Sequence, residues 1–275
     1  MKSCGPTFVK LGQLLSTRSD IIPEAFVDEF KKLQDEVQPV SFDQIKRVLE
    51  QELGGPIENR FSTMSVTPLA SASIGQVHEA TLITGERVVV KIQRPEIEKI
   101  IQNDISLLAF IAKALERYVP EIRIFNPSVI VDEFFRTLVF ELDYKIEANN
   151  MKKISENLAK FEDVVIPRVY KELTTTKVLT LEKLEGIRVN DFIALANSDI
   201  DKKEIVKLGA RAFLKSVMID GLFHGDLHGG NLFILPGNKL GVIDFGIVGR
   251  LSMKARDQLA NMVMALITED YEALC

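Results

Sequence analysis

The sequence predicts an α+β fold made of two lobes, with a helical extension at its N-terminus. Three observations favour this class. The first 60 residues carry apolar side chains at helical spacing, residues 66–92 change to the β-branched pattern of strands, and the chain beyond residue 186 is mainly helical up to Gly221. A strand-rich lobe ahead of a helix-rich lobe suits a ligand held between the two. We therefore divide the chain into the segments 1–60, 61–185 and 186–275.

Individual elements follow from the same patterns. A helix is expected from Pro95 to Tyr118, and a longer one from Ser128 to about Leu158. Residues 182–186 are expected to form a hinge between the lobes. The strands predicted from β-branched runs and turn residues are Val66–Ala70, Gln76–Leu82, Arg87–Ile92, Val164–Val169, Lys177–Leu181, Leu232–Leu235 and Leu240–Ile243.

Composition excludes several classes of function. A chain of 275 residues with a net charge of -5 is a poor candidate for binding nucleic acid, which requires clustered lysine and arginine. The two cysteines, Cys4 and Cys275, lie at opposite ends, so neither a disulfide framework nor a structural zinc site is expected, and a reducing compartment is indicated. No stretch is apolar enough to span a membrane. The chain begins almost inside a helical pattern, which is typical of a piece of a longer protein.

The strongest chemical signal is the segment His224-Gly225-Asp226-Leu227-His228-Gly229-Gly230-Asn231. An aspartate followed five residues later by an asparagine, on a loop before a short strand, has the spacing of the catalytic loop of protein kinases. The Asp226 carboxylate would orient or deprotonate an attacking hydroxyl, and the Asn231 carbonyl oxygen would bind Mg²⁺ without adding charge. The plainer interpretation of this segment is a turn with a capping aspartate.

A second signal, Ile243-Asp244-Phe245-Gly246, begins shortly after the first. A hairpin between the two would return Asp244 to the mouth of the loop that holds Asn231, where the pair would bind Mg²⁺ on the phosphates of ATP. An Asp-Phe-Gly triplet alone is common by chance, but at this spacing it is a strong indication. The two motifs together predict that the two-lobed fold is protein-kinase-like.

The strand-rich lobe supplies candidates for binding the nucleotide. Val88-Val89-Val90-Lys91 reads as a strand ending in a lysine, and Lys91 would contact the α- and β-phosphates; its plainer interpretation is a solvated edge charge. The loop Ala70-Ser71-Ala72-Ser73 stands where a kinase has a glycine-rich phosphate cover. Alanine and serine resist positive φ, so we expect this loop to be stiffer and closer to helical. In the hinge, Glu182 and Leu184 are expected to contact the nucleotide.

Two further motifs carry a resemblance to a known family. Lys10-Leu11-Gly12-Gln13 matches a KxGQ motif, and Glu141-Leu142-Asp143 matches an ExD motif. With the loop and catalytic motifs above, they make the chain resemble the AarF/UbiB family of atypical, protein-kinase-like proteins, from about Phe8 to Tyr271. Without the resemblance, Lys10 would read as an ordinary surface lysine, and the two carboxylates as a solvated helix face.

The resemblance implies a regulated site. The N-terminal helical extension would cover the place where a protein kinase docks its peptide, with Lys10 and Gln13 facing Glu141 and Asp143. We expect one of these carboxylates to contact Lys10 and the other to lie nearer the nucleotide or metal, because residues two apart do not share a helix face. Glu147 matches the family's glutamate that pairs with the strand lysine, here Lys91.

The resemblance also implies a biological setting. An atypical kinase or ATPase that uses ATP and Mg²⁺ would support the biosynthesis of isoprenoid quinones (ubiquinone). Its partners would be the nucleotide, quinone-biosynthesis proteins and membrane lipid. It would lie on the cytoplasmic side of a membrane, peripherally or anchored through a segment outside this chain.

Two other classes of function remain open on the sequence. One is a small-molecule phosphotransferase of the aminoglycoside or choline kinase type, because His228 stands where protein kinases commonly have a lysine. The KxGQ and ExD motifs argue against it, since they would block an open acceptor pocket. The other is a nucleotide-responsive scaffold without turnover, against which the retained Asp226 argues. A histidine near neutral pH is either charged or neutral, so a phosphate contact of His228 is not assured.

Overall fold

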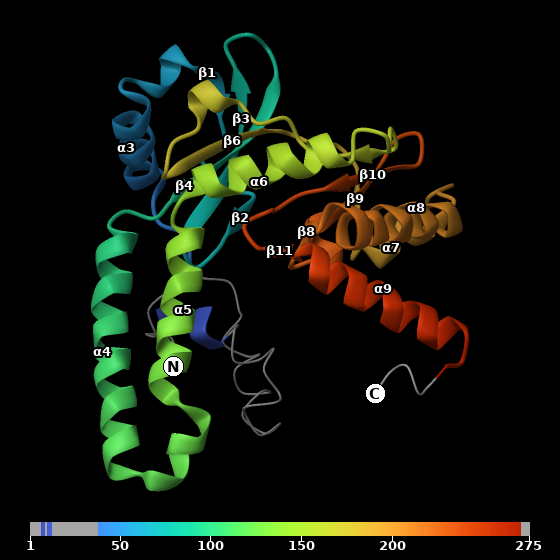
Figure 1. Cartoon of the computed structure of the whole chain (residues 1–275). Coiled ribbons are helices and arrows are strands. Elements are labelled where there is room, and N and C mark those ends of the chain that lie inside the picture. The colour runs from blue at the N-terminus through green and yellow to red at the C-terminus, as the bar shows by residue number, and fades with distance from the viewer. Residues whose placement is uncertain (1–6, 9, 13–37, 271–275) are drawn as a thin grey trace. The chain divides into compact units, whose positions relative to one another are not determined.

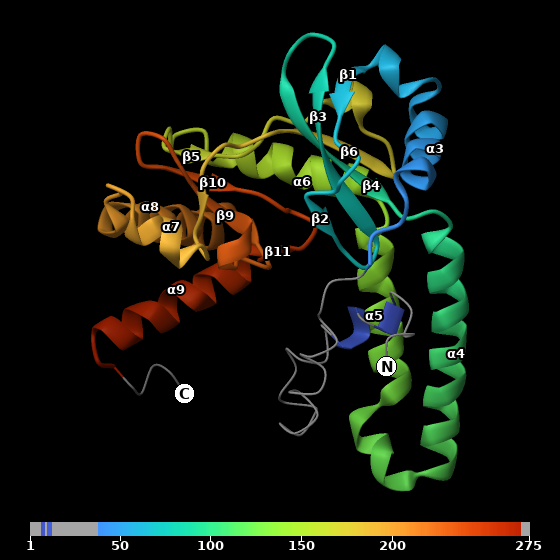
Figure 2. The same cartoon turned by 180° about the vertical axis from the view of Figure 1, so that it is seen from behind.

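The computed structural model describes residues 7–8, 10–12 and 38–270 (Figures 1 and 2). Contacts within the chain divide it into two compact units that alternate along the sequence. Unit 1 comprises the chain up to Tyr144 together with Lys171–Thr180, and unit 2 comprises Lys145–Tyr170 and the chain from Leu181. Both units mix helices with strands. The segment boundaries predicted at residues 60 and 185 stay predictions.

An antiparallel sheet forms the centre of unit 1. Its long hairpin pairs β3 with β4 from Gly75 opposite Gln93 to Thr81 opposite Arg87, as the alternating pattern predicts. Val88, Val90 and Ile92 are fully buried on one face of β4, and this burial anchors the strand. The strands, in the order β1-β3-β4-β6 with β2 beside β3, are β1 (Phe61–Met64), β2 (Ala70–Ser71), β3 (Gly75–Leu82), β4 (Arg87–Gln93) and β6 (Val178–Glu182).

The strand predicted over Val66–Ala70 is wrong. The chain instead leaves the sheet between β1 and β2, and Val66 is 65% exposed. The backbone N–H groups of Ser65 and Leu69 donate to β3, but the residues between them include Pro68, which has no N–H to donate to a ladder. The segment therefore bulges outward between two short paired stretches.

Three helices complete the described part of unit 1: α3 (Phe42–Leu53), α4 (Ile97–Tyr118) and α5 (Pro127–Glu141). In both views α4 and α5 lie side by side (Figures 1 and 2). Ile97 and Ile101 of α4 pack on Phe134 and Leu138 of α5, and Leu11 from the N-terminal helical residues packs on this core. No helix among the described residues is both long and apolar enough to span a membrane.

The long helix predicted from Ser128 to Leu158 is wrong in one respect, because it is two helices. α5 ends at Glu141, and α6 (Tyr144–Asn157) begins after Leu142 and Asp143. Backbone groups at the break form hydrogen bonds with residues that are distant in the sequence. The Gln93 side chain donates to the Leu142 carbonyl at 2.7 Å, and the Tyr144 N–H donates to the Thr176 carbonyl at 3.0 Å.

Unit 2 contains two small sheets and four helices among its described residues. The predicted hairpin between the two catalytic motifs is present as β9 and β10, with Leu232 opposite Val242. The strand predicted over Val164–Val169 is shorter, since only Val164–Val165 pairs with β10. One sheet has the order β5-β10-β9-β7 and the other pairs β11 with β8: β5 (Val164–Val165), β7 (Ile187–Arg188), β8 (Leu222–His224), β9 (Leu232–Leu235), β10 (Lys239–Val242) and β11 (Val248–Arg250). The helices are α6, α7 (Phe192–Ala196), α8 (Lys202–Lys215), which continues into a π-helical turn at Ser216–Asp220, and α9 (Met253–Ile267).

A buried histidine in the sheet of unit 1 belongs to a chain of hydrogen bonds that reaches the residues just before α3. The His78 side chain is fully buried; its Nδ1 donates to the Ser65 carbonyl at 2.8 Å, which leaves Nε2 to accept from Gln76 at 3.3 Å. Gln76 in turn accepts from the Val40 N–H, one residue before the N-cap of α3. Burial lowers the pKa of His78 below its ordinary value, and the bond to Ser65 opposes this only in part.

We expect unit 1 to lose stability in mild acid through His78. The folded state binds its proton less readily than the unfolded state, so the contribution is complete above pH 6.5 and falls as the pH drops below that value. The limiting slope for one proton is about 1.4 kcal/mol per pH unit. Urea unfolding between pH 7.5 and 5 measures it, with His78→Gln as the variant that cannot titrate. Equal slopes in the two proteins would contradict the assignment.

Candidate active site

The loop that follows β8 holds the predicted catalytic aspartate and asparagine together. The side-chain amide of Asn231 donates to the Asp226 carbonyl at 3.1 Å, and Asn231 is 7% exposed. The Asp226 N–H donates to Nδ1 of His224 at 3.1 Å, so the His224 ring carries its proton on Nε2. The side-chain carboxylate of Asp226 is 59% exposed. The loop backbone is thus fixed while its carboxylate stays accessible.

The hairpin β9–β10 returns the second motif to this loop, as predicted. The Ile243 N–H donates to the Asn231 carbonyl at 2.9 Å, and Nε2 of His224 donates to the Ile243 carbonyl at 3.1 Å. Asp244, the next residue, has φ of 61°, a left-handed conformation that residues with side chains seldom adopt. Such a conformation persists only where the surroundings impose it, and here it sets the direction of a predicted metal ligand.

Phe245 anchors the second motif within unit 2. Its ring is 1% exposed and lies 5.0 Å from the His224 ring. From α6, Glu147 accepts a hydrogen bond from the Phe245 N–H at 3.3 Å, and the Asn150 side chain donates to the Phe245 carbonyl at 3.0 Å. Both side chains are buried. One turn of α6 therefore forms hydrogen bonds with both backbone groups of Phe245, its N–H and its carbonyl.

Sequence reasoning missed the roles of two of these residues. His224 lies two positions before Asp226, and it links the catalytic loop to the chain just before Asp244. Asn150 lies three residues after Glu147, a spacing that puts both side chains on one face of a helix. That spacing could have indicated the role of Asn150, because an asparagine buried on the same helix face as Glu147 needs a hydrogen-bond partner nearby.

His228 lies beside the Asp226 carboxylate. Its Nδ1 accepts from the Gly230 N–H at 3.1 Å, which leaves Nε2 to face Oδ2 of Asp226 at 3.9 Å. Both side chains are more than half exposed. At 3.9 Å the two side chains are neighbours without a hydrogen bond. The phosphate contact of His228 considered from the sequence stays a prediction.

In unit 1, the small-residue loop is an extended hairpin, so the expectation of a near-helical loop is wrong. The Ala72 N–H donates to the Gly75 carbonyl at 2.8 Å, and β2 pairs with β3 on either side. A side chain at position 75 would meet the Ile92 carbonyl and the Tyr144 hydroxyl at 2.7 Å, so only glycine fits there. Close backbone approach to β4, and not the propensity of alanine, sets the shape of the loop.

The Arg94 side chain fixes this loop by hydrogen bonds. This role was not predicted from the sequence. Its guanidinium donates to the Ala72 carbonyl at 3.0 Å and to the Ser71 hydroxyl at 2.9 Å, and its backbone N–H donates to the Ile74 carbonyl. Burial lowers the pKa of Arg94 from its ordinary value. Ala70 and Ala72 are exposed while Ser73 is buried, so the four predicted loop residues do not present one common surface. Lys91 lies in β4 opposite Val77.

The expected contact of Lys10 with one carboxylate of the ExD motif is present in unit 1. Lys10 Nζ lies 2.8 Å from Oε1 of Glu141, whose side chain is largely buried. The Thr7 hydroxyl donates to Asp104, which attaches these N-terminal helical residues to α4. Glu141 ends α5 and Asp143 lies in the break before α6, so the two carboxylates do not belong to one helix. Gln13 lies outside the described residues.

The predicted hinge residues lie in unit 2. Glu182, the last residue of β6, donates its N–H to the Arg168 carbonyl at 2.9 Å and accepts from the Arg168 N–H at 3.1 Å through its carboxylate. Leu184 packs near Gly241, where an added side chain would meet it at 2.9 Å. These contacts hold the segment within unit 2, and its binding of a nucleotide stays a prediction.

The two units thus divide the predicted site. Unit 2 brings together Asp226, Asn231, Asp244 and Glu147, and unit 1 holds Lys91, the loop and the Lys10–Glu141 pair. The pairing of Lys91 with Glu147 stays a prediction, because these residues belong to different units. The donors in unit 2 suit Mg²⁺, a hard ion that takes one or two protein oxygens and fills its other positions with phosphate and water.

A loop with the Asp–Asn spacing of kinases, a short hairpin and an Asp-Phe-Gly segment with a buried phenylalanine are together typical of a protein-kinase-like fold. The chain belongs to the family described as the ABC1 atypical kinase-like domain, whose model matches residues 32–275. This finding confirms the predicted α+β, kinase-like class and the resemblance to the AarF/UbiB family.

Named relatives agree with this membership. The chain is 41% identical to "Protein ACTIVITY OF BC1 COMPLEX KINASE 1, chloroplastic" of Arabidopsis thaliana, over 97% of the chain and 39% of that protein. It is 38% identical to "Probable protein kinase UbiB" of Pseudomonas fluorescens (strain SBW25), over 98% of the chain and 52% of that protein. The chain therefore spans about half the length of the curated relatives it matches, or less.

A solved structure is also similar. It is titled "The complex structure of Rv3197-erythromycin from Mycobacterium tuberculosis" and aligns with a TM-score of 0.68 at 28% identity. The alignment covers 96% of this chain and 66% of that one. Nearly the whole chain therefore shares its fold with a solved protein.

Proposed function

We propose that the chain binds Mg-ATP and catalyses transfer of the terminal phosphoryl group to a hydroxyl or to water. One observation carries the proposal: His224 donates to the Ile243 carbonyl and the Ile243 N–H donates to the Asn231 carbonyl, and these two hydrogen bonds hold the Asp226–Asn231 loop and the Asp244 segment together in unit 2. Kinase-like folds need these two segments side by side, because one carries the base and the other a metal ligand. The names of the relatives, which include kinases, support the same class.

Each residue has a role in this proposal. The exposed Asp226 carboxylate would accept the proton of the attacking hydroxyl or water, with His228 beside it. Asn231 and Asp244 would hold Mg²⁺, which when bound neutralises charge on the transferring phosphate. Lys91, held by Glu147, and the Ala70–Ser73 loop would position the phosphates, with Glu182 and Leu184 at the base.

We further propose that the biological setting is isoprenoid-quinone biosynthesis at a membrane surface. The name UbiB of one group of relatives supports the quinone role. The proposed partners are quinone-biosynthesis proteins and membrane lipid. The Lys10–Glu141 contact supports a regulatory role for the KxGQ and ExD motifs, in which the N-terminal helical turn restricts the acceptor side of the site.

The proposal is tested by ATP hydrolysis of the purified chain, with and without anionic liposomes that carry a quinone-like phenol. We expect turnover that rises with the liposomes and falls by about 10²–10⁴-fold in Asp226→Asn, because the variant lacks the general base. Asp257→Asn on α9 is the matched control, an exposed aspartate of unit 2 outside the site.

Two results would contradict the proposal. Nucleotide binding without turnover under every condition would favour a nucleotide-responsive scaffold. Equal turnover in wild type and Asp226→Asn would show that the measured activity does not come from this site.

A further inference from the structure

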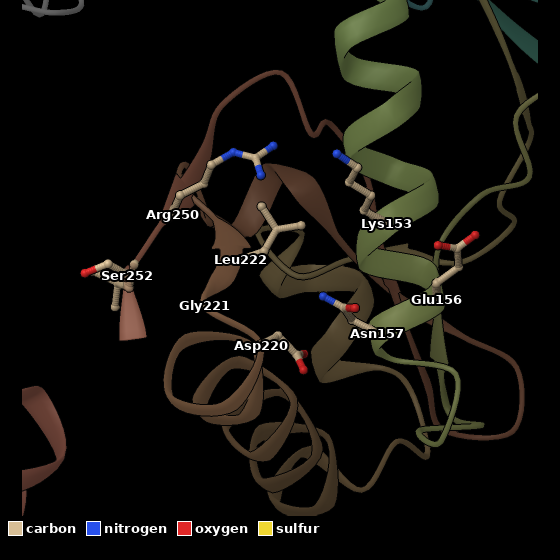
Figure 3. Close-up of a pocket in the computed structure, with 9 residues that line it drawn as sticks. Lys153, Glu156, Asn157, Asp220, Gly221, Leu222, Arg250 and Ser252 are labelled. Atoms are coloured by element: carbon tan, nitrogen blue, oxygen red, sulfur yellow. The ribbon is translucent and has the colours of Figure 1, made fainter. Parts of the chain in front are cut away.

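A cavity of about 500 Å³ that is broadly open to solvent lies on unit 2, and none of the predicted site residues lines it (Figure 3). Its walls come from the C-terminal half of α6, from the turn that leads into β8, and from the residues joining β11 to α9. Cavities of this size hold small molecules in other proteins. Its lining includes both acidic and basic side chains, and their pairing decides which ligand charge the cavity favours.

The cavity is separate from the catalytic loop although it shares elements with it. The cavity lies at the end of the β8–β11 pair where Arg250 is opposite Leu222. The predicted catalytic loop follows the other end, where Val248 is opposite His224. Strand geometry puts these ends about 7 Å apart. On α6, Lys153 follows Glu147 by six residues, about 9 Å along the helix axis.

Both acidic side chains of the lining are already paired with cations. Asp220 accepts from Lys215 at 2.8 Å through each of its two oxygens. Lys215 also donates to the Asn157 carbonyl on α6, which fixes the salt bridge against the wall. Glu156 lies 3.6 Å from Lys152, one turn earlier on its own helix. Neither carboxylate therefore needs a cation from within the cavity.

The two basic side chains of the lining, Lys153 and Arg250, unlike the acidic ones, have no ion-pair partner among the described residues. They point toward one another from opposite walls of the cavity (Figure 3). Two like charges that face each other repel, and an anion between them would turn this repulsion into attraction. The cavity thus has two unpaired positive charges and no unpaired negative one.

Neighbouring groups add to this preference. Ser252 lines the cavity and is the N-cap of α9, where its oxygen accepts from the Ala255 N–H and leaves its O–H available to donate. The first turn of α9 carries no acidic residue, and Lys254 and Arg256 lie in it. The start of a helix already favours negative charge, so basic residues there increase the positive potential at the rim.

We propose that this cavity binds a small molecule through a phosphate monoester, with the phosphate held between Lys153 and Arg250. A phosphate monoester carries close to two negative charges near neutral pH, which matches the two unpaired cations better than a single carboxylate does. The planar guanidinium of Arg250 suits bidentate binding of phosphate, and the Lys153 ammonium acts as a point charge. The remaining cavity volume holds the organic part of the ligand.

Calorimetric titration with glycerol 3-phosphate tests the proposal, in Mg²⁺-free buffer at constant ionic strength. We expect saturable one-site binding that weakens about tenfold or more in Lys153→Ala and in Arg250→Ala, since each removes a charge-assisted contact. Arg250→Lys should bind between these and wild type, because it keeps the charge and loses the fork. Lys203→Ala is the matched control, an exposed lysine of α8 in unit 2 that does not line the cavity.

A second arm identifies the source of the phosphate. Phosphatidylcholine vesicles with and without phosphatidic acid present the same monoester as a lipid headgroup. Binding of glycerol 3-phosphate supports a soluble ligand, and binding of phosphatidic acid vesicles alone supports a lipid ligand, provided that Lys153→Ala removes it. The exposed positions of Lys153 and Arg250 make loss of folding unexpected, and thermal melting checks it.

Three results would overturn the proposal. The first is absence of binding to both probes. The second is equal weakening by Lys203→Ala, which would indicate diffuse attraction to positive charge anywhere on the surface. The third is loss of binding in Asp244→Asn with full binding in Lys153→Ala, which would assign the phosphate to the proposed nucleotide site.

Discussion

Asp244→Asn should fold normally and lose the Mg²⁺-dependent stabilisation by ATP. The substitution preserves shape and removes one negative charge. Asparagine tolerates positive φ at least as well as aspartate, so the conformation at φ of 61° is kept. The weak hydrogen bond that the Gly246 N–H donates to Oδ1 at 3.4 Å also has an acceptor in the variant. Loss of stabilisation would then report the metal site and not the fold.

The expected effect is large enough to measure. ATP at a concentration 100 times its dissociation constant stabilises a folded protein by about 2.7 kcal/mol. For a chain of this size that corresponds to a rise in melting temperature of about 5 °C or more. Thermal melting of wild type and variant, each with ATP plus Mg²⁺, ATP plus EDTA, and neither, measures it. Asp257→Asn serves again as the control.

Unchanged stabilisation in Asp244→Asn would remove Asp244 from the metal site. Stabilisation lost equally with EDTA and with Mg²⁺ would instead mean that the variant perturbs nucleotide binding without any metal. The design separates these outcomes because the Mg²⁺-dependent difference is measured within each protein.

The catalytic half of the site could be predicted from the sequence because its geometry is local. Asp244 comes thirteen positions after Asn231, which leaves room for two short strands and a turn, and a hairpin of that length must bring its ends together. The strands β3 and β4 were predictable for the same reason, since alternation and a turn fix their register.

The features that could not be predicted depend on distant partners. Nothing between Glu141 and Tyr144 is a glycine or proline, so the helical pattern continues through the break. The break exists because Gln93 and Thr176, far away in sequence, take the hydrogen bonds that a continuous helix would use. The extended loop before β3 likewise depends on Arg94, about twenty residues later. Local propensity gives way in both places to long-range hydrogen bonds.

Substitutions of Glu147 should separate two roles that the sequence and the structure assign to it. The structure shows its buried carboxylate accepting from the Phe245 N–H. The sequence predicts that the same carboxylate holds Lys91. Glutamine keeps an oxygen that accepts a hydrogen bond and loses the charge, so Glu147→Gln should retain most of the support for Phe245. If the predicted ion pair positions the phosphates, the variant should lose turnover by about 10²-fold, the effect expected from misplacing a positioning group.

Asn150→Ala is the complementary variant. It leaves Glu147 and its charge unchanged and removes the hydrogen bond to the Phe245 carbonyl at 3.0 Å. A buried carbonyl without a donor costs about 1–3 kcal/mol of unfolding free energy. We therefore expect Asn150→Ala to be less stable than wild type, and Glu147→Gln to be close to wild type in stability but poor in turnover.

Urea unfolding and ATP turnover, measured on both variants and on Glu147→Ala, decide between the roles. Glu147→Ala loses the acceptor and the charge, so it should combine both defects. If Glu147→Gln matched wild type in turnover, the charge of Glu147 would have no part in catalysis and its role would be to anchor Phe245. If Glu147→Gln were as unstable as Glu147→Ala, the hydrogen bond to Phe245 would depend on the full negative charge, because only a charged acceptor would then hold the Asp-Phe-Gly segment in place.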